Sequence, residues 1–414
     1  MRGLTGLLTL ASLSASGSDL RASATLYVDG IFHPQQGETA RDLFGGIGAS
    51  ADLDYRPHPA WRLRAIPRFY LDARDSELHR YLPREASVAF SAGPMDLTVG
   101  LLRFDWGVSE ASRPTDTLNP LDYGQGLLRT EKLAEFATQL RFTVEPWSLE
   151  LVVIPFHQPP QFPTDSASLG LAHGGFTALG LEFDSDWRAP RSVDDVTFAM
   201  RSRATLGPVD LAASWIRGPS RLHGPWLDDV VLRPKDYPVD VVGGSVSWAI
   251  GPVVLRGEAA WIYTGRAPDF RVEENPHPWV RPIPPSHTTY VGGLEAKVWD
   301  LTGDHDLTVV LEYVGEARPY PDVQAALRPL QGDLHMALRW SFDDLDDTRF
   351  GLSALIDVKR GDSVLRLSAE RRLVSELVLR IDAALVVQGE EGPLSVLHNL
   401  ADADVISARL SWTF

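Results

Sequence analysis

The chain has 414 residues, and its 55 acidic against 39 basic side chains give a formal net charge of −16. This acidic balance argues against a nucleic-acid-binding protein, which needs a basic surface to displace counterions from phosphates. The absence of cysteine excludes disulfide scaffolds and thiolate metal sites, and the 44% of hydrophobic residues excludes a disordered chain.

The first residues have the outline of a secretory signal peptide. Arg2 is followed by a short apolar stretch over residues 3–13 and by small residues over 14–18. A positive start, an apolar middle and a small-residue exit are typical of exported proteins, whereas a frayed cytosolic terminus is the alternative. We therefore expect residues 1–20 to be a signal peptide and residues 21–414 to form one domain.

From residue 21 onwards the chain alternates between apolar and polar residues with a period of two. Clear examples are residues 47–55, 334–342, 377–385 and 405–414. This period predicts β-strands with one apolar face. The segments run to about ten residues, the length at which a tilted strand crosses a bilayer, and no run of about eighteen apolar residues predicts a transmembrane helix.

The connections between these segments alternate between short and long. Short turns such as Gly93-Pro94, Gly207-Pro208 and Gly251-Pro252 join some pairs of strands. Long polar loops, rich in proline, are expected near residues 107–133, 157–193, 218–238, 265–288, 316–330 and 389–402. Short periplasmic turns and long extracellular loops are typical of an outer-membrane barrel.

The strand count needs one adjustment. Alternation alone marks about nineteen segments, but a barrel with both chain ends in the periplasm needs an even number. Strand directions across the membrane can be assigned forward from residue 21 and backward from Phe414, and the two assignments conflict between residues 174 and 206. We therefore assign residues 157–193 to one loop. The sequence thus predicts an all-β fold: a transmembrane antiparallel β-barrel of about 18 strands, with 16 as the alternative.

The apolar face of each strand should meet lipid, because an arginine near mid-bilayer costs about 2–4 kcal/mol. Eight tryptophans share this outward parity near strand ends, as in the aromatic girdles of membrane barrels. They are Trp61, Trp106, Trp147, Trp215, Trp248, Trp261, Trp340 and Trp412. The alternative, core tryptophans of a soluble β-protein, explains the parity but not the bias to strand ends.

The last strand ends in Phe414, two residues after Trp412. An amphipathic strand with a terminal phenylalanine resembles the signal by which bacterial outer-membrane proteins are recognised for barrel assembly. The resemblance implies a Gram-negative outer-membrane protein, in contact with outer-membrane lipid, that the barrel-assembly machinery recognises through Phe414.

One stretch carries a narrower resemblance. It reads Val99-Gly-Leu-Leu-Arg-Phe-Asp-Trp-Gly107 and continues, after a loop, with Asp116-Thr-Leu-Asn-Pro-Leu-Asp122. This pattern is similar to a family of outer-membrane barrels related to alginate-export-type porins, although Gly100-Leu-Leu-Arg103 replaces the usual Gly-Arg-Gln. The resemblance implies a role as exit port for an inner-membrane exporter.

Read from its residues alone, the same stretch predicts a strand that ends near Gly107. Alternation puts Arg103 and Asp105 in the lumen and Leu102, Phe104 and Trp106 outside. Asn119-Pro120 favours a turn in which the asparagine binds nearby backbone. We expect this loop either to fold into the barrel mouth and narrow it, or to be an ordinary solvated cap.

The lumen should be lined by charges of both signs. The predicted pore-lining residues are Arg62, Arg64, Arg68, Arg103, Asp105, Arg141, Arg256, Glu258, Glu295, Lys297, Arg339, Arg380 and Asp382. We expect the stripe formed by Arg62, Arg64 and Arg68 to be partly unpaired and to favour anionic solutes. The alternative is that these charges pair across strands and stiffen the wall.

An enzyme is not predicted. The 11 histidines show neither metal-ligand spacing nor a nucleophile elbow, so we expect no catalytic residues, no metal and no cofactor. The expected function is an outer-membrane channel that passes a small or polymeric solute by diffusion, with selectivity set by wall charges and by infolded loops over 107–133 and 157–193. The alternatives are a barrel enzyme that acts on lipid and a plugged structural barrel.

Overall fold

The computed structural model describes most of the chain between residue 19 and the C-terminus. The described residues are 19–32, 43–73, 79–122, 130–158, 160, 182–183, 196–221, 224–228, 231–235, 237–265, 286–299, 305–317, 332–342, 344–359, 361–387 and 404–414. Among these residues, no helix is long and apolar enough to cross a bilayer. The predicted signal peptide lies almost entirely outside them, since the first strand begins at Asp19.

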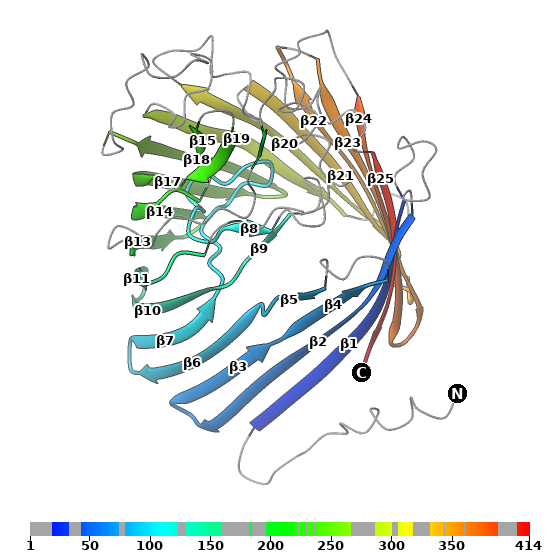
Figure 1. Ribbon diagram of the computed structural model, residues 1–414, viewed down its shortest axis with the longest axis horizontal. Coiled ribbons are helices and arrows are strands. Elements are labelled where there is room, and N and C mark those ends of the chain that lie inside the picture. The colour runs from blue at the N-terminus through cyan, green and yellow to red at the C-terminus, as the bar shows by residue number, and fades with distance from the viewer. Residues whose placement is uncertain are drawn as a thin grey trace.

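The described chain forms one large antiparallel sheet (Figure 1). Its strands are β1 (Asp19–Phe32), β2 (Leu43–His58), β3 (Trp61–Ile66), β4 (Arg68–Asp72), β5 (Arg80–Tyr81), β6 (Glu85–Ala92), β7 (Met95–Leu102), β10 (Glu135–Val144), β11 (Trp147–Ile154), β13 (Thr197–Leu206), β14 (Val209–Pro219), β17 (Pro238–Ile250), β18 (Val253–Tyr263), β19 (His287–Val298), β20 (His305–Ala317), β21 (Gly332–Phe342), β22 (Arg349–Asp357), β23 (Ser363–Val374), β24 (Leu377–Val387) and β25 (Val405–Thr413).

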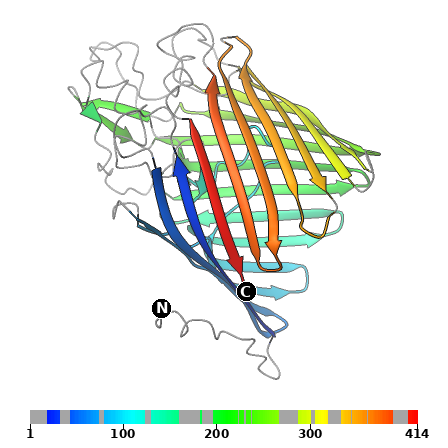
Figure 2. The ribbon, with the colours of Figure 1, turned by 90° about the vertical axis from the view of Figure 1, so that its right-hand side faces the viewer.

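These 20 strands build a wall of 18, because two wall strands are interrupted. β3 and β4 are separated by Pro67, whose missing N–H cannot join the ladder, and β5 and β6 are the two pieces of the next wall strand. β1 pairs with both β2 and β25, which closes the barrel, and Figure 2 shows β25 beside β1. The predicted fold and strand number are confirmed.

The segment over 157–193 contributes nothing to the wall among its described residues. β12 (Glu182–Phe183) pairs instead with β16 (Val231–Lys235), which forms a hairpin with β15 (Gly224–Asp228). Most of 157–193, and most of the loops predicted over 265–288, 316–330 and 389–402, lie outside the described residues. The expectation that 157–193 folds into the lumen therefore stays a prediction.

The predicted short turns are present at one rim. Gly93, Gly207 and Gly251 have φ values of 57°, 61° and 59°, and each is followed by proline. A two-residue hairpin turn of this kind needs a positive φ at its first position, which glycine adopts without strain. β1 begins and β25 ends at this same rim, since Asp19 pairs with Arg56 and Leu377 pairs with Trp412.

The outer surface is apolar. Large hydrophobic side chains on the predicted outward parity are exposed, with Ile47 at 61% and Phe350 at 51% as examples. The tryptophans Trp61, Trp147, Trp248, Trp261, Trp340 and Trp412 are exposed on this face. An apolar band with tryptophans near strand ends is the exterior of a transmembrane barrel of the bacterial outer-membrane type.

Candidate functional site

The chain leaves the wall after β7 and folds into the barrel. We call residues 103–120 the infolded segment; Figure 1 shows it as the cyan trace inside the ring of strands. Phe104, Trp106 and Leu118 are 4%, 2% and 0% exposed. They form one core with inward-facing side chains of the wall: Ala137, Val152, Ile154, Ala199, Ile216, Val239, Val241 and Ala260. Burying each of the three is worth about 1.5–3 kcal/mol, so the segment is firmly docked.

The predicted outward orientation of Leu102, Phe104 and Trp106 is therefore wrong. Even-numbered residues of β7 face inward, as Thr98 and Leu102 show by lining a lumenal cavity. The chain then leaves the wall at Arg103, and beyond that point alternation no longer reports which side meets lipid. The Trp106 indole Nε1 donates to Glu150 at 2.8 Å, so its one polar group is satisfied inside the protein.

Asn119 ties the two ends of the infolded segment together. Its carbonyl oxygen accepts the Phe104 N–H at 2.7 Å, and its amide donates to the carbonyl oxygens of Leu102 at 3.0 Å and Leu133 at 2.9 Å. The sequence predicts a local turn around this residue, but its three hydrogen bonds are to backbone that is fourteen or more residues away. Asn119 is a buried clasp, and its side chain is only 4% exposed.

Glu258 of β18 holds both ends of the segment's tip, which we define as residues 108–115. Its carboxylate accepts the backbone N–H of Val108 at 2.9 Å and of Thr115 at 2.8 Å, and the Thr115 hydroxyl at 2.7 Å. A close approach is possible here because Gly243 has no side chain: a Cβ there would lie 2.6 Å from the Thr115 methyl group.

Glu312 of β20 holds the middle of the tip. Its carboxylate accepts the backbone N–H of Glu110 at 3.0 Å and of Ala111 at 2.7 Å. Glu258 and Glu312 are 3% and 1% exposed, so both negative charges are buried and are satisfied by backbone donors of the tip. Hydrogen bonds to a buried carboxylate are worth about twice those between neutral groups, so these two residues fix the position of the tip.

Lys132 stabilises the base of the segment from β9 (Glu131–Lys132), which pairs with β8 (Leu121–Asp122). Its ammonium group donates to the Phe104 carbonyl oxygen at 2.7 Å and pairs with Asp105 at 3.2 Å and with Asp116. Asp105, a predicted pore-lining residue, is thus placed on the infolded segment, where Lys132 and Arg113 neutralise it.

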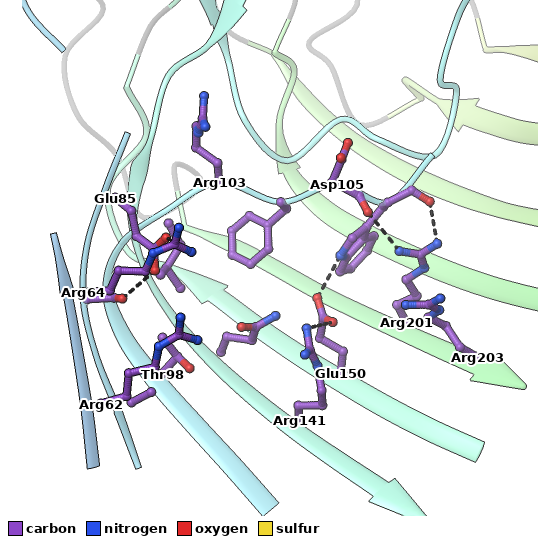
Figure 3. Close-up of a pocket in the computed structure, with 16 residues that line it drawn as sticks. Arg62, Arg64, Glu85, Thr98, Arg103, Asp105, Arg141, Glu150, Arg201 and Arg203 are labelled. Carbon is purple, nitrogen blue, oxygen red and sulfur yellow. Dashed lines mark hydrogen bonds and ion pairs between the residues drawn. The ribbon is translucent and has the colours of Figure 1, made fainter. Parts of the chain in front are cut away.

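A cavity of about 400 Å³ lies against β3, β6, β7, β10, β11, β13 and the start of the infolded segment. We call it the arginine cavity (Figure 3), because six arginines and three carboxylates line it. The arginines are Arg62, Arg64, Arg103, Arg141, Arg201 and Arg203. The carboxylates are Glu85, Asp105 and Glu150.

The stripe of Arg62, Arg64 and Arg68 is paired, which corrects the prediction that it is partly unpaired. Arg62 contacts Asp54 at 2.6 Å, and Arg64 contacts Asp52 at 3.1 Å. Arg68 pairs with Glu131, and its Nε donates to the Tyr27 hydroxyl. Each of the three guanidinium groups has a carboxylate partner, as the alternative of structural pairing predicted.

The positive surplus lies elsewhere in the cavity. Among the described residues, Arg103 and Arg203 form no ion pair. Arg201 binds backbone instead of a carboxylate: it donates to the Trp106 carbonyl oxygen at 2.5 Å and lies over the Trp106 ring. Three guanidinium groups therefore have no carboxylate partner, and Figure 3 shows Arg103 and Arg203 at opposite sides of the cavity.

The surroundings of Arg103 disfavour its positive charge. Its side chain is exposed to the lumen, yet the surrounding protein desolvates the guanidinium group, and the positive charges of Arg84 and Arg68 add to the effect. Together these influences lower the pKa of Arg103 from its ordinary value, although it stays charged at neutral pH. An anion close to Arg103 would relieve both penalties.

The other predicted pore-lining residues lie on inward positions with carboxylate or basic partners. Arg141 contacts Glu150 at 3.2 Å, Arg256 contacts Glu295 at 2.8 Å, Lys297 contacts Asp306 at 2.7 Å, and Arg380 contacts Asp382 at 2.8 Å. Arg339 pairs with Glu110, and Glu258 anchors the tip. Glu110 and Lys132 also belong to the site and were missed, because no strand alternation marks residues of a loop.

Two of the described histidines are buried beside carboxylates. His157 and His287 are buried, and their rings lie 3.4 Å from Glu135 and 3.5 Å from Glu316. Within the described parts of the chain, no group of three or more His, Asp or Glu residues is arranged to hold a metal ion.

Comparison with solved structures gives matches over nearly the whole chain. OccK2 (OpdF) of Pseudomonas aeruginosa, in complex with glucuronate, is 13% identical, with 96% of this chain and 97% of that chain covered and a TM-score of 0.53. OccK1 (OpdK) and OccK8 (OprE) of the same organism are each 11% identical, with 96% and 98% covered and TM-scores of 0.53. The fold is that of an outer-membrane porin.

Neither a comparison with protein-family models nor one with curated protein sequences finds a match. The structural likeness therefore carries the fold, and the solute has to be argued from the lumen of this chain.

Proposed function

We propose that this protein is a channel of the bacterial outer membrane, and not an enzyme, that passes small anionic solutes by diffusion. The observation that carries the proposal is the surplus of guanidinium groups without carboxylate partners in the arginine cavity: Arg103, Arg201 and Arg203. A low-dielectric wall focuses the field of such charges into the water. The similar OccK2 structure contains glucuronate, a sugar carboxylate, which agrees with a solute of this class.

The proposal predicts an effect of two arginines on ion selectivity. We expect purified protein in a planar bilayer to conduct and to prefer anions in a KCl gradient. Replacing Arg103 and Arg203 together with glutamine should move the reversal potential toward cation preference, because two unpaired positive charges are lost from the lumen. The barrel should stay folded, as shown by altered gel migration without boiling.

A paired arginine supplies the matched control. Arg62→Gln combined with Asp54→Asn removes a guanidinium group and its own carboxylate, so the net lumen charge is unchanged. This variant should keep the reversal potential of the unmodified protein. A cation-selective channel, or no shift in the Arg103/Arg203 variant, would contradict the anionic solute; a barrel without conductance would identify the plugged structural alternative.

A role as exit port for an inner-membrane exporter is the finer proposal that the resemblance over residues 99–122 suggests. Three residues of that motif have structural roles in this barrel: Trp106 docks the infolded segment, Asn119 clasps it and Asp122 pairs with Arg80 at 2.6 Å. These contacts explain the motif by its place in the infolded segment more directly than by binding to an exporter. Co-purification with an inner-membrane exporter would be the test.

We also propose that Phe414 marks the chain for the barrel-assembly machinery. Its backbone exchanges two hydrogen bonds of 2.9 Å with Ala24 at the seam, while its ring is exposed on the lipid face. Phe414→Ala keeps the backbone pairing, so we expect normal refolding into lipid vesicles in vitro but less assembled barrel in cells. Equal yields of assembled barrel in cells would contradict the role.

A further inference from the structure

The arginines on the two sides of the lumen differ in their carboxylate partners. On the β3–β13 side, Arg103 and Arg203 have no carboxylate partner among the described residues. On the β18–β21 side, a carboxylate comes from the infolded segment: Glu110 at the tip pairs with Arg339 and lies 3.7 Å from Arg256. Among the described residues, the segment therefore forms ion pairs with wall arginines on one side of the lumen only.

Arg339 depends on Glu110 more than Arg256 does. Arg256 has a second carboxylate, Glu295, at 2.8 Å. Arg339 lies on β21, its side chain is half exposed, and Glu110 is its ion-pair partner in the described structure. If Glu110 were neutral, Arg339 would become a free positive charge in the lumen, whereas Arg256 would stay paired.

The backbone of Glu110 is held in position by a carboxylate of the barrel wall. Its backbone N–H donates to both carboxylate oxygens of Glu312 at 3.0 Å, and the neighbouring Ala111 N–H donates at 2.7 Å. Room for Glu312 is provided by Gly293, where a Cβ would lie 2.6 Å from the Glu312 Cγ. Two buried carboxylates, Glu312 and Glu258, thus hold the backbone that presents Glu110 to Arg339.

We propose that Glu110 is a specificity-determining residue, which neutralises Arg339 and confines the anion-attracting field to the arginine cavity, and that Glu312 and Glu258 are positioning residues for it. The inference rests on the proposed function, since it concerns the ion selectivity of the same channel.

The test is a cycle of substitutions read by reversal potential. Glu110→Gln keeps the backbone hydrogen bonds to Glu312 and should raise the anion-to-cation permeability ratio roughly two-fold, the effect of one unit charge at a distance of about one Debye length in salt solution. Arg339→Gln added to Glu110→Gln should return the ratio to that of the unmodified channel. An unchanged ratio in the Glu110→Gln channel would overturn the specificity role.

Glu312→Asp tests positioning at constant charge, because the shorter side chain no longer reaches the Glu110 and Ala111 N–H groups. We expect greater current noise and an effect of Glu110→Gln that falls to less than half its size in this background, as coupled residues show. A purely structural role would lower the unfolding stability and leave the Glu110→Gln effect intact. Absent conductance, or cation preference in the unmodified channel, would instead overturn the proposed function.

Discussion

Val246→Arg should largely prevent formation of the folded barrel in lipid vesicles. Val246 lies near the middle of β17, faces outward and is 40% exposed. An arginine there would meet the hydrocarbon core, at a cost of about 2–4 kcal/mol, which is a large part of the stability of a barrel. The measurement is the folded fraction from gel migration without boiling, together with urea unfolding in vesicles.

The adjacent residue gives a control at the same depth. Ser247 faces the lumen between Asp210 and Arg256, so Ser247→Arg places the same charge in water next to a carboxylate and a guanidinium group. This variant should fold almost as well as the unmodified protein. Equal losses from the two substitutions would show that the assignment of lipid and lumen faces is wrong.

Asn119→Ala should loosen the infolded segment without opening the barrel. The substitution leaves the Phe104 N–H and the carbonyl oxygens of Leu102 and Leu133 without partners, in a place where the Asn119 side chain is buried. We expect a loss of about 3 kcal/mol of docking free energy. Single-channel recordings should show larger and noisier currents, while gel migration still reports a folded barrel.

Thr117 provides the matched control for this prediction. Its hydroxyl is buried in the same segment and has no hydrogen-bond partner within the described structure. Thr117→Val keeps the shape of the side chain and removes only that hydroxyl, so the currents should not change. Unchanged currents for Asn119→Ala as well would mean that the apolar core alone holds the segment.

The fold could be predicted from the sequence because lipid allows one side of a strand only apolar residues. That requirement makes the alternation of residues 47–55 or 405–414 strict, and the alternation fixes both strand and face. The conflict between residues 174 and 206 corrected the strand count, since the wall has to return to its starting rim. These constraints act along the chain, so one sequence is enough to reveal them.

The site could be predicted only in part, because its contacts join residues far apart in the chain. Leu102, Phe104 and Trp106 are apolar and were therefore assigned to the lipid face, but they follow the inward parity of β7 and pack inside the barrel. The pairing of Arg62 with Asp54 depends on a strand register that the sequence does not specify. The sequence did contain one indication of a segment docked inside the barrel: Val152 and Ile154 make the inner face of β11 apolar as well as its outer face.

Because of this inner apolar face, substitutions in the infolded segment and substitutions on the lipid-facing surface have separate consequences. The lipid-facing residues are constrained by the membrane, while the infolded segment lies inside the barrel, docked on the apolar inner face of β10–β18. Substitutions between Asp105 and Thr115 can therefore alter what passes without touching a residue that lipid constrains. A barrel of this design can acquire a new solute by editing one loop, with the membrane wall unchanged.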